Sequence, residues 1–166
     1  QTECIQHLPP LQAASTSTHL TLLNMLDRRV NCPRTSSAGR LFDAVASILG
    51  IQHINHYEGQ AAMALEHLAR THKHADCYGF DIRFDEHRNT RVLDWEAMIR
   101  GIINDHQQGV PPGRIAAAFH NTLAEMIVAM AQNTEHSRIV LSGGAFQNRY
   151  LSEQVQARLG HTGFQV

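Results

Sequence analysis

The chain has 166 residues, of which 43% are hydrophobic and 17% charged, and its formal net charge at pH 7 is −1. This length is enough for one domain with a real core, or for one lobe of a larger enzyme. The nearly neutral charge gives no electrostatic case for binding nucleic acid or an anionic membrane, and no apolar run reaches the roughly 20 residues that span a bilayer. We therefore expect neither nucleic-acid nor membrane partners. Three scattered cysteines without C-x-x-C spacing fit a reducing compartment, so we expect a cytoplasmic protein. Since the first residue is Gln1 rather than Met, we also expect a piece excised from a longer protein.

Helices are predicted in the first 70 residues. Residues 1–18 have a mixed composition, and we interpret them as a loop or a loosely attached entry segment that is not assigned to a domain. Apolar residues at helical spacing then predict helices over 19–29, over 38–49 and over about 58–70. Serines just before residue 38 are candidate N-caps for the second of these helices.

A β-hairpin is predicted next in the chain. Phe80, Ile82 and Phe84 alternate with charged residues, which is the pattern of a half-buried strand. The sequence "DEHRN" is a plausible turn, and "TRVLDW" is its return strand.

The second half of the chain continues with helices and one further strand. Helices are predicted over 94–107 and 112–133, followed by a strand at 138–141 and by a helix that ends near Leu159. The final "GFQV" has the pattern of the first residues of another strand. The composite is an α/β fold rich in helices.

Three stretches place a glycine at the start of a helix. In "TSSAGRLFDA", Gly39 gives up about 1 kcal/mol of helix propensity relative to alanine. Free N–H groups at a helix start let an anion or a sugar approach the backbone where there is no side chain. Arg40 and Asp43 share one helix face, so the alternative is a surface ion pair beside a flexible cap.

The other two stretches are equally ambiguous when taken alone. In "HYEGQ", Glu58 and Gln60 flank a glycine and either form an acidic first turn or contact a ligand. In "VLSGGAFQN", Gly143 and Gly144 lie between a strand and a helix, with Asn148 one turn into that helix. This arrangement is either a tight turn with positive φ or a backbone cradle for a nucleotide.

Histidines and serines give weaker signals. His53 and His56 are the best local pair for a metal, but no third ligand stands at a sensible spacing, so we predict no metal site in this chain. His120, beside Phe119 in a predicted helix, is expected to be a satisfied and partly buried residue. Ser142 is not in a G-x-S-x-G context, so a serine nucleophile finds no support.

Taken together and in order, four stretches closely resemble the HypF family, the carbamoyltransferases of NiFe-hydrogenase maturation. They are "NCPRTSSAGRLFDAVASILGI", "YEGQAAMALE", "IAAAFHNTLAEMI" and "VLSGGAFQNRYLSE". The resemblance covers roughly residues 20–166. It implies the helix-rich second lobe, over residues 19–166, of a Kae1-like domain with the actin/Hsp70-type (ribonuclease H-like) nucleotide-binding fold.

The resemblance also implies an activity and its partners. In the full-length family member, ATP is cleaved to AMP and diphosphate, carbamoyl-adenylate is formed, and the Kae1-like domain passes the carbamoyl group to the C-terminal cysteine of HypE. The ligands of the family's divalent metal, which is Zn, Fe or Mg, belong to segments outside this chain. The expected partners are therefore a HypE-type protein and the remainder of a HypF chain, and the fragment alone is expected to be inactive.

By the same resemblance, nucleotide contacts are assigned to residues that match the family's motifs. Glu58 and Gln60 match a loop near the nucleotide and are weaker candidates, and no catalytic residue is assigned. The expected contacts with ribose, adenine and phosphate are Ser37, Gly39, Arg40, Asp43, Gly143, Gly144 and Asn148.

Two alternatives remain open at this point. Carbamoyltransferases that act on a hydroxyl of a small molecule share the Kae1-like core, and a non-catalytic interaction module would need no nucleotide.

Overall fold

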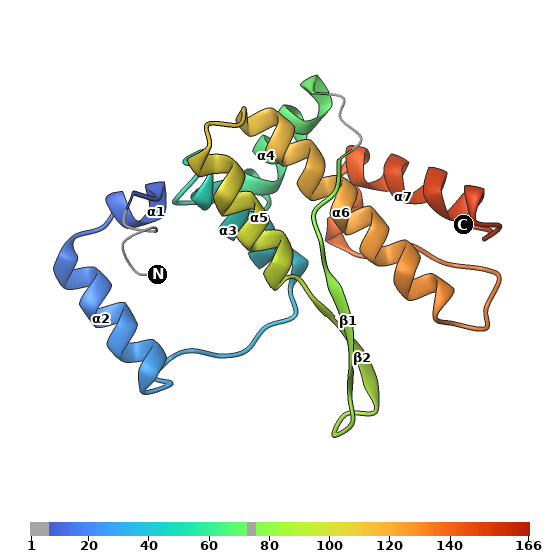
Figure 1. Ribbon diagram of the computed structural model, residues 1–166, viewed down its shortest axis with the longest axis horizontal. Helices are drawn as coiled ribbons and strands as arrows, with labels where there is room; N and C mark the ends of the chain where they lie inside the picture. Colours follow the sequence, from blue (N-terminus) through green and yellow to red (C-terminus); the bar gives the residue numbers. More distant parts are fainter. Residues whose placement is uncertain (1–6, 73–75) are drawn as a thin grey trace. The chain divides into compact units, whose positions relative to one another are not determined.

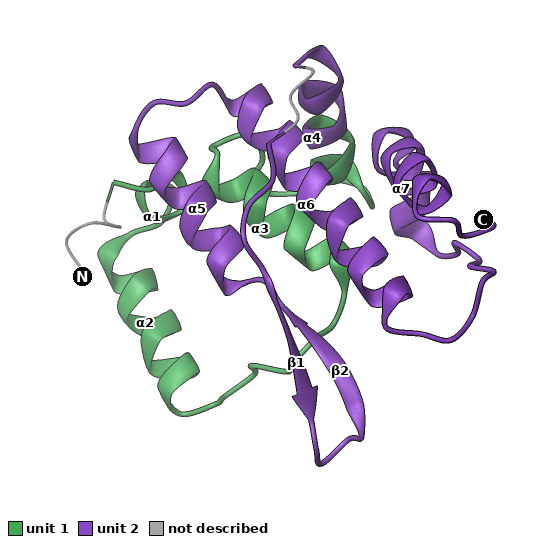
Figure 2. Ribbon diagram, turned by 45° about the vertical axis from the view of Figure 1, so that its right-hand side comes forward, with its two compact units in different colours: residues 1–64 green, residues 65–166 purple. Residues whose placement is uncertain are grey.

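The computed structural model describes residues 7–72 and 76–166, and the chain falls into two compact units, residues 1–64 and 65–166 (Figure 2). Helices dominate both units. Within the described residues, the one sheet is a two-stranded hairpin. None of the helices described is both long and apolar enough to cross a membrane.

Unit 1 is helical. It contains α1 (Pro9–Gln12), α2 (Thr16–Asp27), α3 (Ala38–Ile48) and the start of α4 (Gln60–Thr71). The short helix α1 packs against α3. The buried side of α3 consists of Phe42, Val45 and Ala46, which recur at the spacing of one helix face.

The prediction of a loop over residues 1–18 is wrong where the structure describes that segment. Proline at the first helical positions starts α1, as its fixed φ favours. Ser15 then begins α2, because its side-chain oxygen accepts a hydrogen bond from the N–H of Thr18 at 3.2 Å. Residues 1–6 of this predicted loop lie outside the described residues.

Unit 2 contains the remainder of α4 and a longer series of elements. In chain order these are β1 (Asp81–Asp85), β2 (Thr90–Asp94), α5 (Glu96–Gln107), α6 (Pro112–Gln132), the 3-10 helix η2 (Gly144–Gln147) and α7 (Arg149–His161). The predicted helices over 94–107 and 112–133 are therefore confirmed to within two residues.

The core of unit 2 is built around α6. This helix lies between α5 and α7 and packs against both (Figure 1). Because α6 has neighbours on more than one side, even its polar residues His120, Asn121 and Thr122 are buried. From α7 come Leu151, Val155 and Leu159, one per turn and all buried; burying such a side chain contributes about 1.5–3 kcal/mol.

The hairpin is confirmed, but its burial is not. β1 and β2 pair antiparallel, with Ile82 opposite Leu93 and Phe84 opposite Arg91. The hairpin extends away from the helices of its unit (Figure 1), and Phe84 is 58% exposed. The alternation was a correct signal for strands, whereas the layer that would half-bury them is absent from the described part of unit 2.

The predicted strand at 138–141 is wrong. The segment forms only an isolated parallel bridge between Arg138 and Gln165, with hydrogen bonds from Ile139 N to Gln165 O (2.8 Å) and from Gln165 N to Ser137 O (2.9 Å). A strand exists only when a neighbour pairs along its length. Within the described residues that neighbour is the short stretch around Gln165, and Val140 is 89% exposed.

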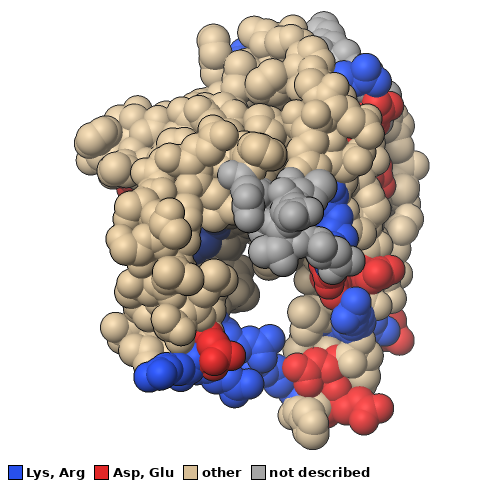
Figure 3. Space-filling model, turned by 60° about the vertical axis from the view of Figure 1, so that its left-hand side comes forward, with Lys and Arg blue, Asp and Glu red and all other residues tan. Residues whose placement is uncertain are grey.

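Charge on the surface is mixed. On the face drawn in Figure 3, acidic and basic side chains lie in small adjacent groups and most of the surface is uncharged. This view shows no broad field of one sign on that face, in agreement with the net charge of −1.

Candidate functional site

The two adjacent glycines of unit 2 are there for different reasons. Gly143 has φ 100° and ψ 165°, a backbone conformation that residues with a side chain rarely adopt. It immediately precedes η2, and its carbonyl accepts a hydrogen bond from Phe146 N at 3.1 Å. Glycine at 143 is therefore explained by the turn itself.

Gly144 has no such explanation among the described residues. Its φ lies outside the left-handed region, and a Cβ built on it would meet no atom of the described residues within 4 Å. Within the described residues, the backbone N–H groups of Gly144 and Ala145 have no hydrogen-bond partner. The exposed turn Gly143–Gly144 thus offers two free donors beside open space.

Asn148 ends this turn and begins α7. The prediction that it lies one turn into the helix is wrong: it is the N-cap, because its Oδ1 accepts a hydrogen bond from Leu151 N at 2.9 Å. Its Nδ2 lies 2.8 Å from Nε2 of His120, and the residue is 7% exposed. Both ends of the Asn148 amide are therefore occupied inside unit 2.

Glu66 of α4 completes the cap of α7. Its Oε1 accepts hydrogen bonds from the N–H groups of Arg149 at 3.0 Å and Tyr150 at 3.3 Å. Since Asn148 already binds the N–H of Leu151, the first turn of α7 has no donor left for a ligand. The carboxylate also places a negative charge at the positive end of the helix dipole. An anion at the glycine turn would therefore bind the N–H groups of η2 and not those of α7.

His120 is the buried partner behind Asn148. It is fully buried, and its Nδ1 lies 2.7 Å from the carbonyl oxygen of Ala116. Burial lowers the pKa of this imidazole to about 4, with a smaller opposing effect of the Ala116 hydrogen bond. The prediction of a satisfied histidine is confirmed, and its burial is complete rather than partial.

The start of α3 in unit 1 is the second exposed helix start. Ser37 is its N-cap by position, but its side chain makes no capping hydrogen bond. Ser37, Gly39 and Arg40 are all exposed. A Cβ on Gly39 would approach only Ser37 Oγ, at an ordinary 3.5 Å, so this glycine is also not required by the fold of the unit.

Asp43 is the most constrained of the candidate residues in unit 1. Its Oδ1 accepts a hydrogen bond from Asn55 Nδ2 at 2.8 Å, which ties the loop after α3 to the helix. Its Oδ2 is 2.8 Å from the Arg40 guanidinium, an ion pair without hydrogen-bond geometry, and this buried oxygen has no hydrogen-bond partner in the described residues. The surface ion pair that the sequence left as an alternative is present, and Asp43 retains the capacity to accept a further hydrogen bond.

The loop before α4 uses one of its two candidates internally. Gln60 Oε1 accepts a hydrogen bond from His56 N at 2.8 Å and thereby holds the turn at the start of α4. Glu58 is exposed, with no hydrogen bond or ion pair in the part of the chain that the structure describes. Glu58 is therefore the better placed of the two for a ligand.

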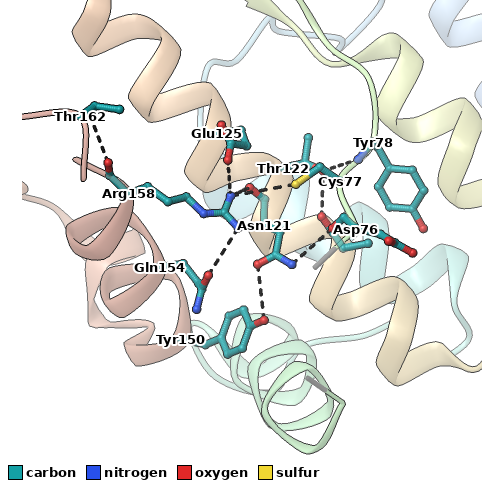
Figure 4. Close-up of polar contacts among 11 residues, drawn as sticks. Asp76, Cys77, Tyr78, Asn121, Thr122, Glu125, Tyr150, Gln154, Arg158 and Thr162 are labelled. Carbon is teal, nitrogen blue, oxygen red and sulfur yellow. Dashed lines mark hydrogen bonds and ion pairs between the residues drawn. The ribbon is translucent and has the colours of Figure 1, made fainter. Parts of the chain in front are cut away.

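A second polar cluster in unit 2 has a structural role (Figure 4). Arg158 of α7 donates to the carbonyl oxygen of Asn121 at 2.9 Å, forms an ion pair with Glu125 at 2.8 Å and lies 4.0 Å from the sulfur of Cys77. Burial raises the pKa of the Cys77 thiol and outweighs the opposite effect of Arg158. The thiol stays protonated at neutral pH, which disfavours it as a nucleophile.

Side chains that could bind a metal do not gather in the described part of the chain. Over residues 7–72 and 76–166, no three His, Cys, Asp or Glu side chains lie close enough together to hold a metal ion. His53, one of the two histidines considered from the sequence, instead shares a hydrogen bond with Ser47 at 2.9 Å. The residues described thus do not fit a complete metal site.

Comparison with known proteins identifies the family. The sequence profile described as "Carbamoyltransferase, Kae1-like Domain, second subdomain" matches residues 2–166, so it includes all but the first residue of the segment 1–18. The chain belongs to the HypF family of carbamoyltransferases. It therefore has the fold of the second part of a Kae1-like domain, as the sequence resemblance implied.

Named relatives agree with this assignment. A "Carbamoyltransferase HypF homolog" of Cupriavidus necator is 38% identical over 162 residues, covering 88% of this chain and 39% of the relative. A "Carbamoyltransferase HypF" of Synechocystis is 34% identical over 142 residues, covering 86% of this chain and 18% of the relative.

A solved structure gives the same result. The crystal structure of full-length HypF in the phosphate- and nucleotide-bound form superimposes with a TM-score of 0.86 at 34% identity, covering 95% of this chain and 21% of that one. The chain thus spans from about a fifth to two fifths of the length of these HypF proteins.

Proposed function

We propose that this chain supplies part of the nucleotide site of a HypF-type carbamoyltransferase, in which the glycine turn Gly143–Gly144 binds ATP or carbamoyl-adenylate. The observation that carries the proposal is that position 144 is a glycine although the described fold does not require one there. Its backbone conformation does not require glycine, and no neighbouring atom in the described chain excludes a Cβ. Where the backbone conformation is compatible, glycine is less stable than alanine by about 0.4–1 kcal/mol because its unfolded chain is freer, and a ligand that approaches the backbone closely accounts for that cost.

Two further observations support a nucleotide as the ligand. The free N–H groups of Gly144 and Ala145 suit an acceptor such as a ribose, base or phosphate oxygen. The HypF protein whose structure superimposes on this chain was crystallised in a phosphate- and nucleotide-bound form.

The start of α3 is proposed to contact the nucleoside. Gly39 is a second helix-start glycine that the fold of its unit does not need. Within the described residues, Oδ2 of Asp43 is paired only with the exposed Arg40 side chain, so it can accept a hydrogen bond from a ribose hydroxyl once that side chain moves aside. Ser37, whose hydroxyl makes no cap, and Glu58 provide further polar contacts.

The chemistry proposed for the whole protein is carbamoyl transfer from the adenylate to a thiol: a C–S bond forms, the bond between the carbamoyl carbon and the phosphate oxygen breaks, AMP leaves, and the thiol proton is released. The acceptor is the C-terminal cysteine of a HypE-type protein, and a divalent metal would be held by residues outside this chain. The role of the residues described here is binding and orientation, which convert a collision into a directed reaction. No group of this chain is assigned as a general base.

The test uses the full-length protein and measures its affinity for ATP by calorimetry. Gly144→Val is expected to raise the Kd by at least about ten-fold, because a branched side chain fills the open space beside the two donors. Gly160→Ala, at an exposed glycine in the last turn of α7 with nothing within 4 Å, is the matched control and should leave the Kd unchanged.

Unchanged affinity in Gly144→Val, with the protein folded, would rule out the glycine turn as a nucleotide contact. Gly39→Val tests the α3 start independently by the same measurement. With binding established, a HypE tail peptide compared with small hydroxyl compounds as carbamoyl acceptors identifies the acceptor class.

A further inference from the structure

His120 contacts Asn148, the residue that follows the proposed nucleotide-binding turn and η2. Its imidazole is enclosed between the rings of Phe119 and Tyr150, with ring centroids 5.5 and 5.4 Å away and both contacts edge-on. In this apolar surrounding, each ring nitrogen nevertheless lies within hydrogen-bond distance of a polar group: Nδ1 is 2.7 Å from Ala116 O, and Nε2 is 2.8 Å from Asn148 Nδ2. A polar side chain buried this completely destabilises the fold unless its polar atoms are hydrogen-bonded.

The polarity of this hydrogen-bonded chain is fixed from both ends. At one end the carbonyl of Ala116 can only accept, so Nδ1 of His120 carries the proton and donates. Nε2 must then accept, so the amide nitrogen of Asn148 faces it and donates. At the other end the N–H of Leu151 can only donate, which requires the oxygen of Asn148 on that side. One tautomer and one amide orientation satisfy all four groups.

The orientation of Asn148 matters because this residue closes the glycine turn. Its backbone N–H donates to Ala145 O at 3.3 Å, which ends η2. One turn later, Ser152 Oγ donates to Phe146 O at 2.6 Å. The segment from Gly143 to Gln147 is therefore attached to the start of α7 by Asn148 and Ser152. The side-chain amide of Asn148 is in turn hydrogen-bonded to Nε2 of His120.

We propose that His120 is a positioning residue for nucleotide binding: through Nε2 it fixes the Asn148 amide, and Asn148 in turn keeps the Gly143–Gly144 turn in the conformation that presents the N–H groups of Gly144 and Ala145. This inference rests on the proposed function of the turn. It assigns to a buried residue of α6 a measurable effect on a ligand that it does not touch.

Two substitutions separate the two nitrogens of His120 in the full-length protein. In His120→Gln, the amide oxygen reaches the position of Nε2 and can still accept from Asn148. In His120→Asn, the shorter amide replaces Nδ1 and keeps the contact with Ala116, but leaves Asn148 without its acceptor. We expect His120→Asn to raise the Kd for ATP about ten-fold, in the range of other indirect contacts, and His120→Gln to raise it less than about three-fold.

Two further variants guard against a merely structural effect. Thr122→Val removes another buried polar group of α6, whose Oγ1 accepts from Tyr78 N at 2.8 Å and has no contact with the turn (Figure 4). It should lower the melting temperature and leave the Kd unchanged. Asn148→Ser keeps a good N-cap but no longer reaches His120, and should weaken ATP binding as His120→Asn does even if the latter folds poorly.

The outcomes distinguish the inference from the proposed function. Equal changes of Kd in His120→Gln and His120→Asn, or a normal Kd in Asn148→Ser, would overturn the positioning role. A normal Kd in Gly144→Val would overturn the nucleotide site itself. Loss of binding in Gly144→Val together with normal binding in His120→Asn would leave the proposed function standing and refute only the role of His120.

Discussion

Replacing Gly101 by alanine should destabilise α5, although the same change normally stabilises a helix. Gly101 lies in the interior of α5, where alanine is favoured by about 1 kcal/mol. A Cβ at this position, however, would lie 2.6 Å from Cδ1 and 3.1 Å from Cε1 of the Tyr78 ring. These distances are well inside van der Waals contact, so either the ring or the helix must move.

The Tyr78 ring cannot move easily, because hydrogen bonds restrain both the backbone and the hydroxyl of this residue. Its backbone N–H donates to Thr122 Oγ1 at 2.8 Å, and its hydroxyl donates to Asp105 Oδ2 at 2.8 Å, one turn along α5 from Gly101. Burial, together with the neighbouring Asp105 carboxylate, raises the pKa of this phenol, so it remains a donor at any ordinary pH. Forcing an extra methyl into such packing costs about 1–3 kcal/mol, which outweighs the gain in helix propensity of about 1 kcal/mol, and we expect a net loss of up to about 2 kcal/mol.

Native-state hydrogen exchange of a peptide covering α5 measures this change in the free energy of opening. Gly160→Ala serves as the control, because that helical glycine has nothing within 4 Å and should show a gain in protection of α7. In a protein that already carries Tyr78→Ala, the change Gly101→Ala should lower the free energy of opening much less than it does in the wild type, because the ring that it meets is absent. Stabilisation by Gly101→Ala, as by the control, would refute the packing of Tyr78 on Gly101.

Two further predictions concern the start of α7 and the residue behind it. Glu66→Ala should speed hydrogen exchange of the Arg149 and Tyr150 amides and cost about 1 kcal/mol, as does the loss of a cap, whereas equal exchange would show that the carboxylate does not bind them. The pKa of His120 is about 4 in the native state and 6.5 in the reference state, so between these values the unfolded chain binds a proton that the native state does not. The free energy of unfolding is therefore unaffected by this group above pH 7 and decreases as the pH falls from 6.5 towards 4. The full loss is about 3 kcal/mol, and about 2 kcal/mol of it should be visible at pH 5 as the difference between the wild type and His120→Gln in exchange protection of α6; parallel losses in both proteins would contradict a buried neutral imidazole.

Local features of the fold were predictable from the sequence. Apolar spacing located α5, α6 and α7 because each buries one face or more against neighbours that the same pattern also predicts. The alternation in "FDIRFD" located the hairpin. It could not show that Phe84 would be exposed, because burial depends on what covers a strand and not on the strand itself.

Contacts between distant segments were not predictable in this way. The bond between His120 and Asn148 joins residues 28 positions apart, and the cap from Glu66 to Arg149 joins residues 83 apart. A single glutamate in an alanine-rich helix carries no signal of the helix end that it caps. The glycines were the useful signal. The conformational entropy that each glycine loses on folding can be inferred from the sequence at that position, even where the ligand proposed to explain it lies outside the chain.

The segment around Val140 presents an open backbone edge with which another strand can pair. In the described residues its backbone hydrogen bonds go only to the short stretch at Gln165, so one edge of an extended, apolar segment is open. Such an edge accepts any strand of matching length, including the same segment of another molecule. A strand supplied by the same polypeptide has an effective concentration in the millimolar range and would outcompete that self-association. Dilute solution, or the covalently attached remainder of a HypF protein, should therefore keep this edge from joining two molecules.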